Sequence, residues 1–337
     1  MRAFVVTEPL VGAVHEVAAP VAARGGVVVD VHRVGVCGTD VEFFTGEMAY
    51  LHQGHASYPM RLGHEWCGVV AEVGGGVDEQ WLGRRVTGDT MLGCGHCARC
   101  RSGRQHLCHD RLEIGIRGGF PGALAEQLAV PASALVELPD AVDDLAGAMV
   151  EPGGNALRAV RGADLAVGDR VLVLGTGTIG LLAAEFARAQ GAEVHLMAHS
   201  EASGGFARTL GFAGVWLESA LPQVAWDAVI EASNAATLPA LAVDLVEPGK
   251  RVVFIGLAGT PSHVDTRTIA LKDVTAVGIL SASAGLADTV THYAAGDVDP
   301  RPMVAATVGL EQVGDVLAGV RPPDAGPGPK IHIDPRT

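Results

Sequence analysis

A glycine-rich turn between an apolar run and an amphipathic stretch constrains the fold of this chain most strongly. The run Arg170–Leu174 is predicted to be a strand, and three glycines with the spacing G-x-G-x-x-G follow it and lead into a predicted helix at residues 181–189. The first glycine permits a tight turn, the second lets a pyrophosphate approach the backbone, and the third lets helix and strand pack closely. The exposed amides at the helix start would meet the phosphate charge. The pattern predicts a dinucleotide-binding loop made of Gly175, Thr176, Gly177, Thr178, Ile179 and Gly180.

Further strand-like runs follow this loop and alternate with helical stretches. They are Glu193–Met197, Ala225–Glu231, Arg251–Ile255 and Thr275–Ile279. This rhythm is typical of an α/β domain with a doubly wound parallel sheet. A nicotinamide would lie at the carboxyl edge of such a sheet, against the loops that follow the strands. The alternative is that the residues of these loops only end the strands. The candidates at this edge are Gly256, Leu257, Ile279 and Leu280.

The end of the second strand bears on the choice between NAD and NADP. In NAD-binding domains an acidic residue about 20 residues beyond the glycines holds the adenosine ribose. This chain has His199 and Ser200 at that place, and these side chains could accept a 2′-phosphate. The sequence therefore favours NADP, while Glu201, one residue further on, is an argument for NAD.

Four cysteines lie within fifteen residues in the first half of the chain. Thiolates with two-residue gaps can converge on one tetrahedral Zn²⁺, with sulfur about 2.3 Å from the metal. Two short disulfides would need an oxidising compartment, and free loop thiols would leave the spacing unexplained. Four sulfurs leave no open coordination position, so the sequence predicts a structural zinc site formed by Cys94, Cys97, Cys100 and Cys108.

A second metal site is possible in the same half of the chain. Short strand-like runs at Val27–Val34, Cys67–Val73 and Ala125–Val130 suggest a small barrel. Cys37 and the pair His64 and Glu65 lie between the first two runs, and such a mixed set can leave one zinc position open. Spacing alone favours the alternative that Cys37 is a small buried thiol and His64 a hydrogen-bonded turn residue.

Composition excludes several classes of function. The chain has 337 residues, 48% apolar and 18% charged, which suits two globular domains. Its net charge of −14 opposes a zinc-finger nucleic-acid binder or a protein of anionic membranes, because such binding depends on Lys and Arg. The first residues do not resemble a secretory signal, and no apolar run reaches about 18 residues. We expect a cytoplasmic protein with reduced thiols.

The segments Val36–Asp40 and Gly63–Glu65, the four-cysteine lobe and the glycine loop together resemble the zinc-dependent medium-chain alcohol dehydrogenases in type and order. The resemblance covers essentially the whole chain. It implies a GroES-like β-barrel catalytic domain at residues 1–150 with a structural zinc lobe at 94–108. It further implies a Rossmann coenzyme domain at 151–285 and a return segment at 286–337 that completes the catalytic domain. Homodimers and homotetramers are both usual in this family.

The resemblance also implies the catalytic zinc ligands. Cys37 and His64 would bind the ion, and Glu65 would be a carboxylate able to swap in. Glu151 matches the glutamate that polyol, sorbitol and threonine dehydrogenases use as the third protein ligand, where other alcohol dehydrogenases have cysteine.

Thr39 would relay a proton from the substrate to the cofactor ribose. Its alternative role is to cap a helix that begins at Asp40. The family's relay continues to a histidine, but Glu42 stands at that position here, so the outer relay departs from the family pattern.

The implied function is hydride transfer between a nicotinamide cofactor and a secondary alcohol, such as a polyol, sugar or aminocyclitol. One alternative is an NADPH-dependent reductase of aldehydes that acts on primary alcohols. Another is a non-catalytic dinucleotide-binding module, which would have no need of Cys37, His64 and Glu151 as a ligand set.

Overall fold

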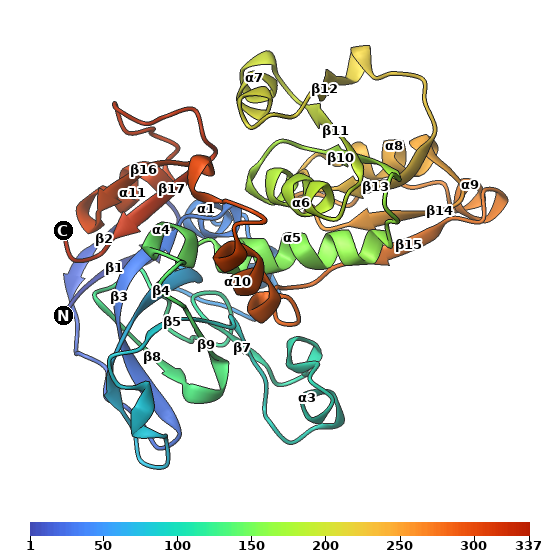
Figure 1. Ribbon diagram of the computed structural model, residues 1–337. Helices are drawn as coiled ribbons and strands as arrows, with labels where there is room; N and C mark the ends of the chain where they lie inside the picture. Colours follow the sequence, from blue (N-terminus) through green and yellow to red (C-terminus); the bar gives the residue numbers. More distant parts are fainter. The chain divides into compact units, whose positions relative to one another are not determined.

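The computed structural model describes residues 1–337, and the chain forms two compact units (Figure 1). Unit 1 consists of Met1–Glu151, Leu286–Ala295 and Asp299–Thr337. Unit 2 consists of Pro152–Gly285 and Gly296–Val298. None of the helices has the length and hydrophobicity that spanning a lipid bilayer requires.

Unit 1 is built on a seven-stranded sheet in the order β16-β17-β3-β4-β5-β9, with β8 also paired to β3. The pairs are antiparallel except β16 with β17. The run at Val27–Val34 lies in β3 as predicted, and Val27, Val29 and Val31 are fully buried. The strands are β3 (Gly26–Gly35), β4 (Glu65–Val73), β5 (Arg85–Gly88), β8 (Gln127–Pro131), β9 (Leu135–Glu137), β16 (Val304–Gly309) and β17 (Lys330–Asp334).

Two short ribbons and several short helices complete unit 1. The ribbons pair β1 (Arg2–Glu8) with β2 (Val11–Glu16), and β6 (Met91–Leu92) with β7 (Leu112–Glu113). The helices are α1 (Gly38–Thr45), α2 (Ala49–His52), α3 (Ala98–Arg101), α4 (Asp144–Gly147), α10 (Leu286–Ala295) and α11 (Val313–Leu317). Helix α3 lies in a lobe that projects from the strands of unit 1 (Figure 1).

Unit 2 contains a six-stranded parallel sheet in the order β12-β11-β10-β13-β14-β15. The apolar strand β10 lies in the middle and four of its five residues are buried, which is typical of a sheet covered on both faces. The strands are β10 (Arg170–Leu174), β11 (Glu193–Ala198), β12 (Gly214–Leu217), β13 (Trp226–Glu231), β14 (Val246–Phe254) and β15 (Thr275–Gly278). The helices that connect them are α6 (Thr178–Ala189), α7 (Glu201–Thr209), α8 (Leu238–Leu245) and α9 (Thr266–Leu271), and α5 (Val150–Ala163) precedes β10.

The predicted fold class, a β-rich domain with a doubly wound parallel sheet, is confirmed. Two local details differ. Helix α1 begins at Gly38 rather than Asp40, and Cys37 occupies its N-cap position, so Thr39 lies inside the first turn instead of capping it. Helix α6 begins at Thr178, three residues before the predicted start at residue 181, and Gly177 is its N-cap.

Candidate active site

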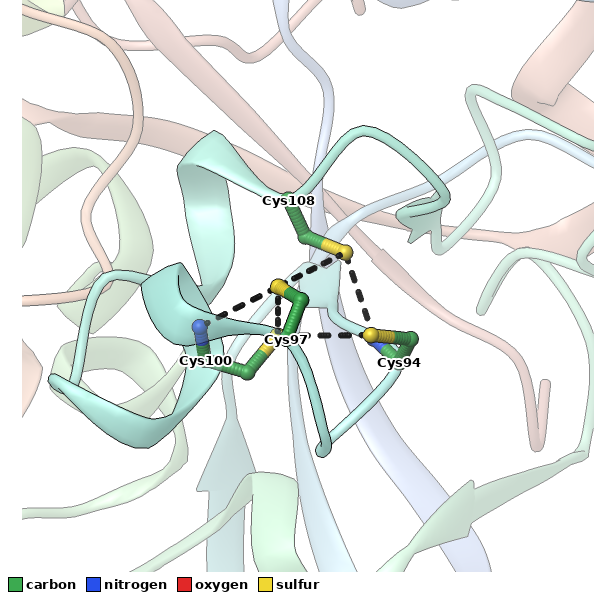
Figure 2. A group of neighbouring side chains, drawn as sticks. All are labelled: Cys94, Cys97, Cys100 and Cys108. Atoms are coloured by element: carbon green, nitrogen blue, oxygen red, sulfur yellow. Dashed lines mark hydrogen bonds between the residues drawn. The ribbon is translucent and has the colours of Figure 1, made fainter.

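The four cysteines of the lobe converge on one point (Figure 2). Their sulfur atoms all lie within 4.8 Å of one another, and all are free rather than disulfide-bonded. Cys97 caps α3, and the Cys100 amide donates a hydrogen bond to its sulfur at 3.4 Å. That hydrogen bond lowers the pKa of the Cys97 thiol to about 7, which favours the thiolate that binds metal.

The distances between the sulfurs fit a tetrahedral metal site. Four ligands at about 2.3 Å from a central Zn²⁺ must lie about 3.8 Å from each other. The sulfur atoms of Cys97 and Cys100 are 3.5 Å apart, those of Cys97 and Cys108 are 3.8 Å apart, and those of Cys94 and Cys100 are 4.0 Å apart. The lobe is therefore a structural zinc site with no position left for a substrate.

A second group of donor atoms lies at the ends of the central strands of unit 1. Cys37 follows β3, whereas His64 and Glu65 stand at the start of β4. One donor atom from each of these three residues lies within 4.8 Å of the others. Because β3 and β4 are paired, with Gly35 opposite Glu65, the sheet register brings the two segments together. This is a mixed sulfur, nitrogen and oxygen set of the kind that catalytic zinc sites use.

Asp40 holds the two segments of this group in place. Its buried carboxylate accepts hydrogen bonds from the Cys37 amide at 2.9 Å and from the Gly63 amide at 3.0 Å. It also lies 3.4 Å from Nδ1 of His64. Burial is the largest influence on this carboxyl and opposes ionisation, but the His64 charge and the two amides outweigh it and lower the pKa of Asp40. The opposite charge correspondingly raises the pKa of His64, despite burial. From the sequence, Asp40 is expected only to begin a helix, so this role was not predicted.

Lys330 forms a buried ion pair with Glu65. Its Nζ lies 2.6 Å and 2.9 Å from the two carboxylate oxygens, and it also donates to the Val36 carbonyl at 2.9 Å. Gly35 makes room for this carboxylate, since a Cβ there would lie 2.1 Å from Oε2 of Glu65. Lys330 is 3% exposed, and no spacing in the sequence relates it to residue 65. It was therefore missed, because β17 reaches the site only in the folded sheet.

Removing Lys330 should destabilise unit 1. We expect Lys330→Met to lower the free energy of unfolding by about 3 kcal/mol, because it leaves the Glu65 carboxylate buried and without its counterion. The matched control is Lys250→Met, which breaks an ion pair with Asp227 in which the lysine side chain is 40% exposed. That substitution should cost less than about 1 kcal/mol. Urea denaturation of both variants measures the difference, and equal losses would contradict the role given to Lys330.

The remaining predicted catalytic residues are found as follows. Glu151 is the second residue of α5 and is buried, but it does not belong to the group within 4.8 Å. Thr39 is half-buried in the first turn of α1, two residues past Cys37. Glu42 lies in the same helix, and burial, followed by the charge of Glu47, raises its pKa.

In unit 2 the glycine loop has the geometry that its spacing predicted. Gly175 follows β10 with a φ of +111°, and Gly177 is the N-cap of α6. A Cβ on Gly180 would lie 2.1 Å from the Gly175 carbonyl oxygen, so helix and strand pack too closely for a side chain. A Cβ on Gly177 would meet nothing within 4 Å, which leaves the backbone open to a ligand. The buried Thr176 hydroxyl has no hydrogen-bond partner in the chain. These features fit a bound pyrophosphate.

The other candidate cofactor residues follow the carboxyl ends of parallel strands. His199 and Ser200 follow β11, and Ser200 caps α7 by accepting from the Ser203 amide. The Ser203 hydroxyl lies 3.2 Å from Nδ1 of His199. Further along this edge, Gly256 and Leu257 follow β14, and Ile279 and Leu280 follow β15. Leu257 and Leu280 are exposed, at 73% and 40%.

Comparisons with known proteins agree with this arrangement. Residues 23–140 match the alcohol dehydrogenase GroES-like domain, and residues 178–294 match the zinc-binding dehydrogenase family. An L-threonine 3-dehydrogenase of Sinorhizobium fredii is 30% identical, over 99% of this chain and 98% of that protein. The chain belongs to the zinc-binding medium-chain alcohol dehydrogenase family. It is thus a zinc-dependent NAD(P) dehydrogenase that acts on alcohols.

Two solved structures show the same fold over the whole chain. A candidate zinc-binding dehydrogenase from Sinorhizobium meliloti 1021, bound to NADP, is 28% identical with a TM-score of 0.88, covering 99% of both chains. Alcohol dehydrogenase TADH from Thermus sp. ATN1 is likewise 28% identical with a TM-score of 0.88, covering 99% of both chains.

Proposed function

We propose that the chain oxidises a polyhydroxylated or amino-substituted secondary alcohol, with the catalytic zinc held by Cys37, His64 and Glu151. The observation that carries the proposal is the convergence of Cys37, His64 and Glu65 around the buried Asp40 and Lys330. Lys330 contacts both oxygens of Glu65, which supports Glu65 as the exchangeable ligand and Glu151 as the permanent one.

Each residue has a definite task in this reaction. A bound zinc supplies Lewis-acid polarisation of the substrate oxygen. Asp40 orients His64 and fixes the turn that presents Cys37, which keeps the donor atoms in place before substrate arrives. Thr39 would accept the hydroxyl proton of the substrate and pass it outward, with the ribose of a bound cofactor as the acceptor. Glu42, which replaces the usual histidine, alters the outer end of that route.

We assign residues 1–150 and 286–337 to a catalytic domain and residues 151–285 to a coenzyme domain. In the coenzyme domain the loop at 175–180 would hold the pyrophosphate, His199 and Ser200 the adenosine ribose, and residues 256–257 and 279–280 the nicotinamide. NADP is favoured because no carboxylate directly follows β11, and because the Sinorhizobium meliloti structure contains NADP. Free rather than disulfide-bonded cysteines support a cytoplasmic enzyme. The assignment of a homodimer or homotetramer rests on the resemblance to the family alone.

The substrate class is supported by Glu151 and by the threonine dehydrogenase relatives. The decisive experiment is a cofactor-reduction screen of polyols, aminocyclitols, amino-acid alcohols and primary alcohols, run with NAD and NADP in parallel. Secondary alcohols with neighbouring hydroxyl or amino groups should give the highest kcat/KM, and NADP should exceed NAD. Turnover confined to primary alcohols or their aldehydes would contradict the proposal and favour a reductase.

Two glycines of the loop should separate cofactor binding from stability. Gly177→Ala adds a methyl group where the chain has open space, so we expect an unchanged Tm. The same methyl group would meet the pyrophosphate, so the Kd for the cofactor should rise by roughly tenfold or more. Gly180→Ala is the matched comparison, because its Cβ overlaps the Gly175 carbonyl and should lower Tm itself. Thermal denaturation without cofactor and fluorescence titration with NADPH measure the two effects. An unchanged Kd for Gly177→Ala would show that the pyrophosphate lies elsewhere.

A further inference from the structure

A cavity of about 210 Å³ lies in unit 1 between the segment at residues 56–61 and the segment at residues 116–121. Its walls are mainly apolar and include Val5, Met60, Ile116 and Phe120. Ile116 is buried, whereas Ser57 at the margin is exposed. None of the proposed zinc ligands or cofactor residues lines it. The proposed catalytic function therefore leaves this cavity without a role.

Arg61 is the only charged residue that lines the cavity. Its guanidinium is half-buried, and burial lowers its pKa without any carboxylate counteracting the shift. No hydrogen bond or ion pair joins this side chain to the rest of the protein. By contrast, Arg85, which lines another cavity, donates to Asp144 at 2.9 Å. A guanidinium that is partly removed from water and left unpaired lacks the partner that such groups normally have.

Backbone hydrogen bonds hold the two wall segments of the cavity in place. The Gly122 amide donates to the Arg61 carbonyl at 3.0 Å, and the Gly118 amide donates to the His55 carbonyl at 2.9 Å. These bonds fix the two wall segments to each other. The Met60 carbonyl in turn accepts from the Val6 amide at 2.9 Å, which attaches the same wall to β1. A ligand would meet a preformed site and would need to order little of the chain.

We infer that this cavity is a second ligand site, separate from the zinc centre, that binds a small carboxylate with a compact apolar body. The guanidinium of Arg61 would form a bidentate ion pair with the carboxylate, with two parallel N–H···O hydrogen bonds. The apolar walls would cover the body of the ligand, and the volume limits it to about the size of one ring or a short branched chain. A neutral isostere would lose the charged contact, and a bare inorganic anion would lose the apolar one.

The test is calorimetric titration of the zinc-loaded full chain with benzoate as the probe and benzamide as its neutral counterpart. Benzoate should bind saturably, and benzamide should bind at least about tenfold more weakly. Arg61→Gln should weaken benzoate binding by about tenfold or more. The affinity of Arg61→Lys should lie between those of the glutamine variant and the unmodified chain, because lysine keeps the charge but cannot bind a carboxylate in a bidentate manner. The matched control is Arg117→Gln, which removes the same charge next to the wall residue Ile116 and should change affinity by less than about twofold.

Three outcomes would overturn the inference. They are the absence of saturable benzoate binding, equal binding of benzamide, and benzoate binding that survives Arg61→Gln. The last would place the carboxylate at a metal ion or another cation. Thermal denaturation guards against a folding artefact: Arg61 has no partner to lose, so Arg61→Gln should leave Tm unchanged. If Tm fell, Arg61→Lys would decide alone, and an affinity equal to that of the unmodified chain would reject the paired geometry.

Discussion

Cys37→Ser is expected to lower kcat/KM for the best alcohol substrate by roughly a thousandfold or more, while the protein remains folded. A serine hydroxyl is a poor zinc ligand, and Lewis-acid stabilisation of developing charge contributes several kcal/mol, with each 1.4 kcal/mol equal to a factor of ten. The thiol is half-buried at the N-cap of α1, so its loss removes little packing. The measurements are steady-state kinetics, metal analysis and circular dichroism. Zinc should fall from two ions per chain to one.

The control is the same substitution at another cysteine of the same sheet. Cys67 lies in β4 two residues beyond Glu65 and is fully buried. It belongs to neither of the two groups of metal-binding side chains. Its thiol donates only to the Asp144 carbonyl at 3.3 Å, a bond that serine can replace. Cys67→Ser should keep both zinc ions and most of the activity. Near-normal turnover of Cys37→Ser, or an equal loss in both variants, would reject the proposed catalytic zinc.

Cys97→Ser should act on stability rather than on chemistry. It removes one of four sulfurs from a closed tetrahedral site, and structural zinc contributes its binding free energy directly to folding. We expect release of the lobe zinc and a Tm lower by about 10 °C, because a loss of about 3 kcal/mol shifts Tm by a few degrees per kcal/mol in a domain of this size. Scanning calorimetry with metal analysis measures both.

The neighbouring His96 provides the control for this second prediction. Its imidazole could bind a metal, but it does not belong to the group formed by the four cysteines. Its Nδ1 lies 2.9 Å from the Cys94 carbonyl oxygen. His96→Gln should therefore keep the lobe zinc and the original Tm. An unchanged Tm for Cys97→Ser, or zinc loss from His96→Gln, would mean that the lobe is held together in another way.

Local patterns in the sequence were sufficient for features that depend on nearby residues. Strand β10 has the bounds that the apolar run predicted, and the glycine spacing predicted the turn into α6. The four lobe cysteines could be assigned to one metal because all of them lie within fifteen residues of chain. Strand β12 was not among the predicted runs, since its four residues, Gly-Val-Trp-Leu, are too short to show a clear period.

The sequence by itself determined the parallel sheet, the glycine loop and the four-cysteine lobe, because each leaves a recognisable pattern of residue types along the chain. Only the tertiary structure decided how Asp40 joins Cys37 to His64, that Lys330 neutralises Glu65, and that Arg61 has no partner. The Lys330–Glu65 pair, for example, joins charges that are 265 residues apart in the sequence. No periodic pattern in the sequence indicates such a pair, because only the register of the folded sheet brings the two groups together. Burial then makes the loss of either partner costly in free energy.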